Sequence, residues 1–270
     1  LSGLRSAFEP QGARLIGGHT LEARAEAPTH LSLGLQVSLT VNGKRPAHPW
    51  KKGGLQPGDQ LLLSRPLGTG VLFAAAMAGA AQPEDLDHAL AQMGTSQHPI
   101  VQQLQELINL EAKTKAKAQP SCTDVTGFGL LGHLGEMLQA SSQSLQVVLD
   151  GSAIPALPGA LKLLKAQYAS SLAPANRRAW SLLDPSQEQP AKVILARADS
   201  GFDPEDHKAL LELLVDPQTC GPLLLGCSEA MADALLQAND TAWHRIGVVS
   251  ASRADSACAS AAIQPLDLDL

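Results

Sequence analysis

Residues 122–134 read CTDVTGFGLLGHL, a stretch that predicts a strand, a glycine-rich turn and the start of a helix in direct succession. Asp124 closes the strand expected over 121–124, and glycines open the helix expected over 127–140. In α/β folds, ligands bind where strands end and helices begin. An aspartate there can coordinate Mg²⁺ on nucleotide phosphates, and glycines let the backbone and the helix N-terminus approach those phosphates. The alternative is structural, because Asp124 or Thr126 can also serve as a helix cap.

Short aliphatic segments alternate with amphipathic or alanine-rich segments along the rest of the chain. The aliphatic segments predict strands and the others predict helices, two of which open with a proline and acidic residues. This alternation is typical of the α/β or α+β fold class. Residues 169–201 fit neither pattern. Strands are expected over 60–64, 145–149, 223–227 and 245–249, and helices over 70–81, 83–93, 99–117, 159–168, 204–214 and 229–238.

The N-terminal segment carries the clearest strand signal. In residues 31–41 every odd position is aliphatic and every even one is small or polar, which predicts a strand with one buried face. The short unit around it cannot cover that face, so we expect it to pair with a second copy in a dimer. Over 42–59 the composition changes to Gly, Pro, Lys and His and ends in a turn signal. We therefore expect two domains, 1–56 and 57–270.

Composition excludes several classes of protein. The chain has 270 residues, 44% of them apolar, without the run of about 18 apolar residues that a bilayer span needs. Its 20 basic and 26 acidic residues give a net charge of −6 with no dense basic cluster, which argues against nucleic acid as a partner. The four cysteines form no C-x-x-C pair, so we expect no zinc site and a reducing, cytoplasmic environment. The start at Leu1 has neither an initiator methionine nor signal-peptide features, which favours a piece of a longer protein.

A second glycine motif consists of Gly17, Gly18 and His19 and follows a short apolar segment. Two glycines after a strand most simply make a turn, and the alternative is a loop that cradles a phosphate. No Gly-Lys-Ser/Thr follows, so this is not a Walker motif. His133 lies one helical turn past Gly129, which favours a histidine on a helix face. The sequence has neither a Gly-x-Ser-x-Gly elbow nor paired zinc-hydrolase histidines, so a hydrolase has no support.

Four motifs, taken together and in order, resemble the selenide, water dikinases (selenophosphate synthetases) over nearly the whole chain. Each motif alone also resembles the wider superfamily of aminoimidazole ribonucleotide synthetase, thiamine monophosphate kinase and the hydrogenase maturation proteins. The third motif is most similar to the selenium enzymes. The motifs are Gly17–Thr20, Gln56–Asp59 with Leu61–Gly70, Thr123–His133 and Asp216–Thr219.

The resemblance implies a two-domain fold of the aminoimidazole ribonucleotide synthetase type, with an N-terminal barrel domain shared in a homodimer and a C-terminal α+β domain. It implies an enzyme that splits ATP into AMP and phosphate while the γ-phosphoryl group passes to hydrogen selenide, giving selenophosphate. Mg²⁺ ions would hold the phosphates through several aspartates. Asp124 matches one of these aspartates. Gly17, Gly18 and His19 match a segment that contacts ATP bound mainly by the neighbouring subunit.

The other catalytic groups of that family lie upstream of the residues matched here. They are a reactive cysteine or selenocysteine, a nearby lysine and two further aspartates, so we expect this chain alone to be inactive. Some members are fused to a flavin-dependent oxidoreductase, and because this sequence has no dinucleotide fingerprint, such a module would lie outside it. Two alternatives stay open: another ATP-using enzyme of the superfamily, and a non-catalytic nucleotide-binding or dimerisation module.

Two loops depart from the family pattern. Cys220-Gly221-Pro222 stands where the family has Ser-Gly-Gly, and the small-residue loop before the family's asparagine reads Ala173-Pro174-Ala175 before Asn176. We interpret Cys220 as a serine replacement in a turn, and the alternative is a partly exposed reactive thiol. The departures leave the expected fold intact and concern the roles of these loops.

Overall fold

The computed structural model describes residues 2–20, 37–44, 49–113, 119–184, 191–196, 203–238 and 243–252. It divides the chain into two compact units, residues 1–49 and 50–270. The first unit contains helix α1 (Ser2–Phe8) and a 3₁₀ turn (Glu9–Gln11). Among the described residues, no helix is long and apolar enough to cross a membrane. The division falls inside the Gly- and Pro-rich segment 42–59, and the two domains 1–56 and 57–270 stay a prediction.

The strand predicted over 31–41 is not formed in the part of it that the structure describes. Residues 31–36 lie outside the described residues, and residues 37–44 carry no regular structure. The aliphatic side chains at positions 37, 39 and 41 are exposed. An extended segment becomes a strand only when a neighbour supplies hydrogen bonds, and none of the described residues bonds to this backbone. The prediction is therefore wrong for residues 37–41 of the single chain, and pairing with a second copy stays a prediction.

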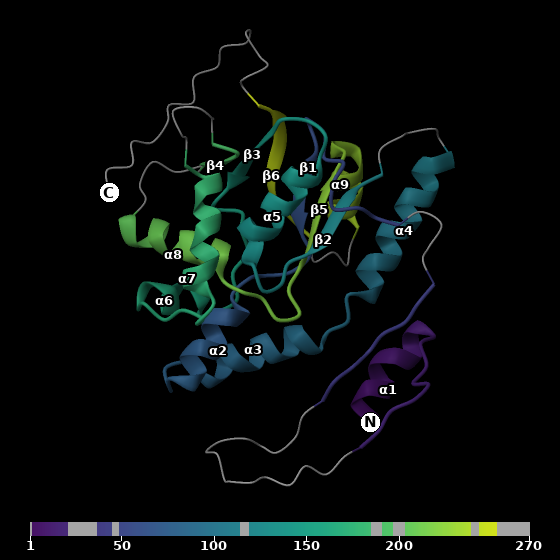
Figure 1. The fold of residues 1–270 in the computed structure, drawn as a ribbon, viewed down its shortest axis with the longest axis horizontal. Helices are drawn as coiled ribbons and strands as arrows, with labels where there is room; N and C mark the ends of the chain where they lie inside the picture. The colour runs from purple at the N-terminus through teal and green to yellow at the C-terminus, as the bar shows by residue number, and fades with distance from the viewer. Residues whose placement is uncertain are drawn as a thin grey trace. The chain divides into compact units, whose positions relative to one another are not determined.

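A mixed six-stranded sheet forms the centre of the second unit (Figure 1). Its strands are β1 (Gln60–Leu63), β2 (Ser121–Asp124), β3 (Leu145–Asp150), β4 (Val193–Ala196), β5 (Leu223–Cys227) and β6 (His244–Ala251). They lie in the order β2-β5-β1-β6-β3-β4, antiparallel throughout except for the parallel pair β3 and β4. The expected strands in this unit are confirmed, and β4 adds one from the stretch 169–201.

The second unit has eight α-helices among its described residues, of which α5 and α8 pack on one face of the sheet and α4 and α9 on the other. They are α2 (Thr69–Met77), α3 (Pro83–Gly94), α4 (His98–Lys113), α5 (Gly129–Ala140), α6 (Ala160–Lys165), α7 (Ala173–Asn176), α8 (Pro204–Val215) and α9 (Glu229–Gln237), with a 3₁₀ helix over Arg177–Leu182. The predicted helices are confirmed, several with shifted ends, and residues 114–117 of the helix expected over 99–117 lie outside the described residues. Helix α2 stops earlier than expected because the chain turns at Gly79, whose φ is +71°. The α/β class of this unit is therefore confirmed.

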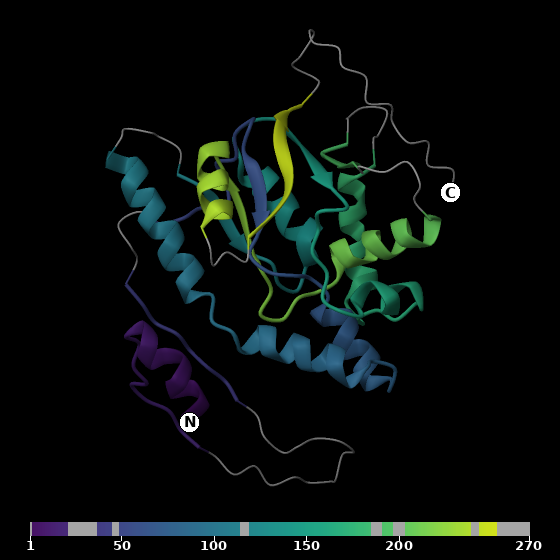
Figure 2. The same ribbon diagram turned by 180° about the vertical axis from the view of Figure 1, so that it is seen from behind.

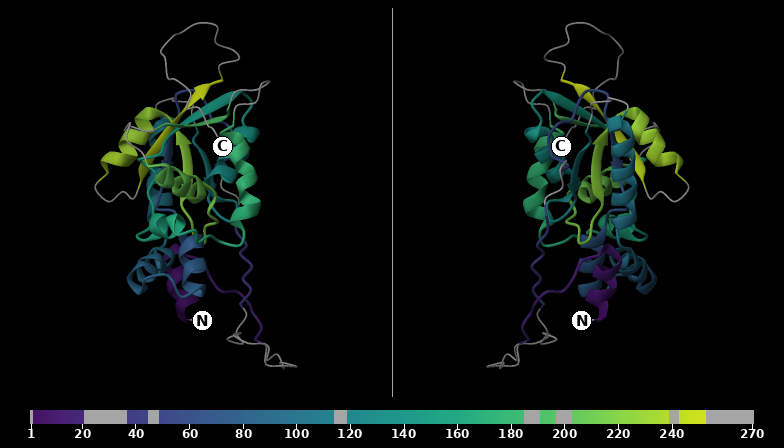
Figure 3. Two further views of the ribbon diagram at one scale, coloured as in Figure 1. Left: turned by 90° about the vertical axis from the view of Figure 1, so that its left-hand side faces the viewer. Right: turned by 90° about the vertical axis from the view of Figure 1, so that its right-hand side faces the viewer.

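Side chains that alternate along β1 divide the core into two clusters. Leu61 and Leu63 point into the larger cluster with α5 and α8, whereas Leu62 points into a smaller one with α4 and α9. Helix α5 lies in front of the sheet in Figure 1, and the reverse view in Figure 2 brings α4 and α9 to the front. The edge-on views in Figure 3 show helices on both sides of the sheet. The sheet is therefore buried on both faces.

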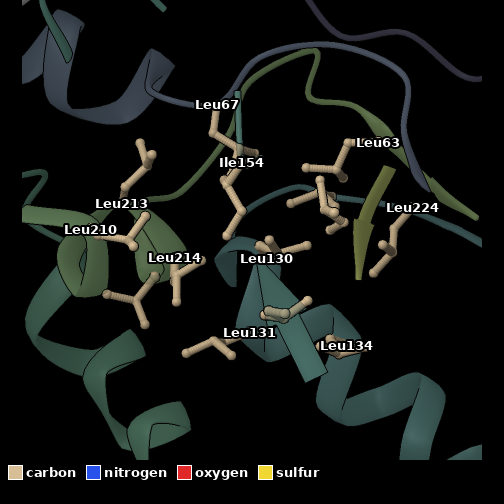
Figure 4. Packing of buried hydrophobic residues seen from close by; sticks show 14 of the residues in the cluster. Leu63, Leu67, Leu130, Leu131, Leu134, Ile154, Leu210, Leu213, Leu214 and Leu224 are labelled. Carbon is tan, nitrogen blue, oxygen red and sulfur yellow. The ribbon is translucent and has the colours of Figure 1, made fainter. Parts of the chain in front are cut away.

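Leucines make up most of the larger cluster. Figure 4 shows Leu130 of α5 between Leu214 of α8 on the left and Leu63 of β1 on the upper right, with Leu134 further along α5. These four side chains are fully buried. Burying such a side chain contributes about 1.5–3 kcal/mol. The aliphatic core therefore fixes α5, and with it the loop that precedes this helix.

Candidate functional site

The loop from Asp124 to Gly129 joins β2 to α5. Asp124 ends β2 and pairs in register with Leu223, the first residue of β5. The Asp124 side chain is exposed, and no described residue forms an ion pair or a hydrogen bond with its carboxylate. Helix α5 begins after Phe128 without a side-chain cap, so neither Asp124 nor Thr126 caps it. The capping alternative is therefore wrong here, and the charge of Asp124 is available to a ligand.

Backbone hydrogen bonds hold this loop against the turn that precedes β5. The Val125 N–H donates to the Pro222 carbonyl at 2.8 Å. The Thr126 carbonyl accepts from the N–H groups of Gly129 and Gln218, each at 3.0 Å. Gly129 adopts a φ of +69°, a conformation that strains other residues. Asp124 thus begins a loop in which hydrogen bonds of the backbone hold the next two residues, Val125 and Thr126.

Asn176 fixes the third loop residue. Its buried side-chain amide donates to the carbonyl oxygens of Gly127 at 2.8 Å and Val215 at 3.0 Å. Val215 is the last residue of α8, so a single amide joins the β2–α5 loop to the end of another helix. The sequence pattern over 169–201 did not reveal this role. The signal that could have found it is the match to the asparagine of the resembling family.

The Asp-Pro-Gln-Thr segment that begins at Asp216 closes onto the N-terminus of α2. Asp216 Oδ2 accepts from the Gly70 N–H at 3.0 Å. Gln218 Oε1 accepts from the N–H groups of Gly68 at 2.9 Å and Thr69 at 3.2 Å. These bonds satisfy donors that the start of a helix leaves without partners. Burial raises the pKa of the Asp216 carboxyl to about 7, and its Oδ1 accepts no hydrogen bond from the described residues.

Cys220 lies in the turn before β5 with a φ of +50°, and its side chain is exposed and not in a disulfide. The buried Arg65 donates from Nη1 to the carbonyl oxygens of Cys220 and Gln92, each at 3.1 Å, which fixes the backbone of this turn. The turn position agrees with a serine replacement, and the role of the thiol stays a prediction. Burial raises the pKa of the Cys122 thiol to about 12, which disfavours this second cysteine as a nucleophile.

A series of polar contacts leads from Lys52 to the loop. Lys52 Nζ donates to Glu136 Oε2 at 2.5 Å, and this bond holds the pKa of the Glu136 carboxyl below its usual range. His133 Nδ1 lies 3.1 Å from the same Glu136 oxygen. His133 Nε2 lies 3.2 Å from the Thr126 hydroxyl oxygen. His133 is on α5 as predicted, but it is buried and does not face solvent.

An aromatic ring and a cation flank the same loop. The Phe128 side chain is exposed, and the Arg178 guanidinium lies 5.9 Å from the centre of its ring. Arg178 itself is exposed and forms no ion pair with the described residues. Cations of this kind attract phosphate groups. The loop therefore presents one carboxylate with an aromatic face and a cation beside it.

Gly17, Gly18 and His19 lie in the first unit, where they are exposed and carry no regular structure. A Cβ added at Gly17 or Gly18 would meet no atom within 4 Å, so local packing does not require glycine at either position. Asp124 belongs to the second unit, and each unit is described by itself. Their common role stays a prediction.

The metal-binding capacity of the described residues is small. They contain no group of three or more His, Cys, Asp and Glu side chains that could hold a metal ion. Mg²⁺ is usually bound by one or two carboxylates together with substrate phosphates and water. One exposed carboxylate fits that mode, so Asp124 can be one ligand of a site that other groups complete.

An open hollow lies at the end of strands β2 and β5 opposite to Asp124. Its lining includes Asp59, which precedes β1, and Cys227, which ends β5. Burial raises the pKa of the Asp59 carboxyl. Because β5 begins beside Asp124 and ends at this hollow, the hollow is separate from the candidate site.

The sheet order and the helices on both faces define an α/β domain built on a mixed six-stranded sheet. The chain belongs to the family described as AIR synthase related protein, C-terminal domain, which residues 56–257 match. The chain is also similar to curated selenide, water dikinases. The enzyme of Geobacter metallireducens is 32% identical over 240 residues, covering 87% of this chain and 58% of the relative. The enzyme of Trichlorobacter lovleyi is 34% identical over 244 residues, covering 88% and 58%.

The chain thus spans about 58% of the length of these relatives. Among solved structures, thiamine monophosphate kinase from Aquifex aeolicus has a TM-score of 0.45 at 14% identity, covering 75% of this chain and 50% of that one. The hydrogenase maturation protein HypE of E. coli has a TM-score of 0.43 at 17% identity, covering 75% and 46%.

Proposed function

We propose that the chain is part of a selenide, water dikinase, an enzyme that uses ATP and selenide to make selenophosphate, AMP and phosphate. The similarity to these enzymes over 87–88% of the chain supports the proposal. Because the chain spans about 58% of their length, the activity is proposed for the whole protein and not for these residues alone. The purified chain should therefore release no AMP from ATP and selenide.

The observation that carries the proposal is the exposed carboxylate of Asp124, which has no hydrogen-bond or ion-pair partner among the described residues and begins a loop whose backbone is held by hydrogen bonds. Asp124 would be one ligand of Mg²⁺, which when bound would neutralise charge on the ATP phosphates. Gly17, Gly18 and His19 would contact ATP in a homodimer joined through the first unit. The nucleophile and its lysine would come from residues outside this chain.

The test is Asp124→Asn in the complete enzyme, with Asp87→Asn as the matched control. Both aspartates are exposed, and Asp87 lies on α3 away from the loop. We expect selenide-dependent AMP formation to collapse in Asp124→Asn, while its free energy of unfolding stays within about 1 kcal/mol of the parent, because an exposed substitution seldom costs more. The control should keep its activity. An Asp124→Asn enzyme that is active and responds to Mg²⁺ would contradict the assignment.

A non-catalytic nucleotide-binding or dimerisation module is the second candidate, favoured by the lack of a three-ligand metal cluster among the described residues. A third is another ATP-using enzyme of the same superfamily. The coding sequence upstream of Leu1 separates the first two, because a glycine-rich stretch with a cysteine and a lysine supports the kinase. Measuring ATP turnover with and without selenide separates the third.

A further inference from the structure

His133 and Glu136 lie on α5 next to the Asp124 loop without belonging to it. We propose that they are positioning residues, which act through the Thr126 hydroxyl to hold the loop in the conformation that presents the Asp124 carboxylate. The purpose of that conformation rests on the function proposed above. The physical link itself rests on contacts among described residues.

The charge of Glu136 determines which atoms donate and which accept in these hydrogen bonds. A carboxylate bound to the Lys52 ammonium at 2.5 Å can only accept hydrogen bonds. His133 Nδ1, 3.1 Å from Glu136 Oε2, must therefore carry a hydrogen. In the neutral ring Nε2 is then the acceptor, and the Thr126 hydroxyl, 3.2 Å away, donates to it. Each bond thus fixes the orientation of the next group, from Lys52 to Thr126.

Thr126 is where this series can act on the site. It lies two residues after Asp124, and its carbonyl is already held by two backbone donors. Those donors leave its side chain free to rotate, so the bond to the buried His133 ring supplies the remaining constraint. Groups that hold a metal-binding residue from behind typically change metal affinity about 10–100-fold when removed. A side chain that never contacts the ligand can therefore control how the loop presents Asp124.

A purely structural role makes a different prediction. His133 and Glu136 are three residues apart on one helix, and such a pair can simply stabilise the helix. Its removal would then lower the melting temperature without altering amide exchange in the loop or the response of the loop to a cation. The two roles therefore separate by spectroscopy rather than by stability.

The experiment uses the full chain labelled with ¹⁵N, and Mn²⁺ as the probe. The ring ¹⁵N shifts of His133 report which nitrogen carries the hydrogen, and Mn²⁺ broadens amide signals near its binding site. We expect a protonated Nδ1 and broadening at residues 124–128 in the parent chain. Glu136→Ala should move the ring hydrogen, speed amide exchange in this loop and weaken the Mn²⁺ effect about 10-fold. Glu136→Gln keeps an acceptor for Nδ1 and should restore most of the parent behaviour.

His88→Phe is the control, because the exposed His88 on α3 contacts the Glu84 carbonyl and not the loop. It should leave the loop unchanged. A ring hydrogen on Nε2 alone in the parent, or parent-like loop exchange and Mn²⁺ response in Glu136→Ala, would overturn the proposal. Faster loop exchange in Glu136→Ala would support the positioning role even where the parent shows no Mn²⁺ broadening, because groups outside this chain and substrate phosphates complete the proposed metal site; the metal assignment of Asp124 is tested by Asp124→Asn in the complete enzyme. Glu136 is partly exposed, so these variants keep the core intact.

Discussion

Replacing Asn176 by alanine should lower the free energy of unfolding of the second unit by about 2–4 kcal/mol. Its buried amide donates to the carbonyl oxygens of Gly127 and Val215, and alanine supplies neither bond. A buried group left without a partner costs about 1–3 kcal/mol. Gly127 is partly exposed, so water can replace its donor in part, whereas Val215 is fully buried and must bear the full cost. A small cost at the Gly127 carbonyl and a larger cost at the Val215 carbonyl together give the expected loss of about 2–4 kcal/mol.

The assay is urea denaturation followed by circular dichroism, with Asn109→Ala as the matched control. Asn109 is exposed on α4, and among the described residues its side chain accepts a hydrogen bond from Gln105, so its replacement should change stability by no more than about 0.5 kcal/mol. Asn176→Asp is a second variant, because its side chain must bind a proton before it can donate even one bond. It should be less stable at pH 8 than at pH 5. A loss below about 1 kcal/mol in Asn176→Ala, with an unchanged denaturant slope, would refute this account of the loop.

Four further results are expected. Burial raises the pKa of the Asp216 carboxyl from 3.8 to about 7. Protonated Asp216 therefore stabilises the fold at low pH, and this stabilisation is lost as the pH rises from 3.8 through about 7. Over this pH range the melting temperature of the parent should fall relative to that of Asp216→Asn. Gly221→Ala should cost about 1–3 kcal/mol in denaturation, because its Cβ would lie 2.0 Å from the Val125 carbonyl oxygen. Gly18→Ala meets no atom within 4 Å and should melt like the parent, while raising the KM for ATP in the complete enzyme. Light scattering at micromolar concentration should find a dimer, and a monomer would count against pairing through residues 31–41.

Elements with a strong local signal could be predicted from the sequence. Helix α8 begins at the expected proline, and the Asp203 carboxylate before it accepts from the Glu205 N–H at 3.1 Å. Helix caps and the periodicity of apolar residues depend on residues that are close in the sequence. Strand β4 and helix α7 could not be predicted, since each has four residues and no period of its own. Strand β4 exists because it pairs in parallel with β3, a contact that no local pattern encodes.

The same distinction between local signals and contacts with distant residues applies to the candidate site. Asp124 could be predicted because the signal, an acid between a strand and a glycine turn, lies within a few residues. Its supports could not, because Lys52 and Glu136 are 84 residues apart, and Asn176 lies 49 residues from the carbonyl that it holds. The order of the motifs along the chain gave no indication of which ones meet.

In the structure, the motifs that carry the family resemblance have different roles. Asp216 and Gln218 hold the start of α2, and the Gln218 N–H also binds the Thr126 carbonyl, so one segment serves both the helix and the loop. Asn176 and His133 hold the same loop from two other helical segments. Asp124 itself has no such partner among the described residues. Under the proposed function, this exposed carboxylate at the start of a loop held from several sides would bind Mg²⁺, and substitutions at the supporting residues should then change that binding without any contact to the ion.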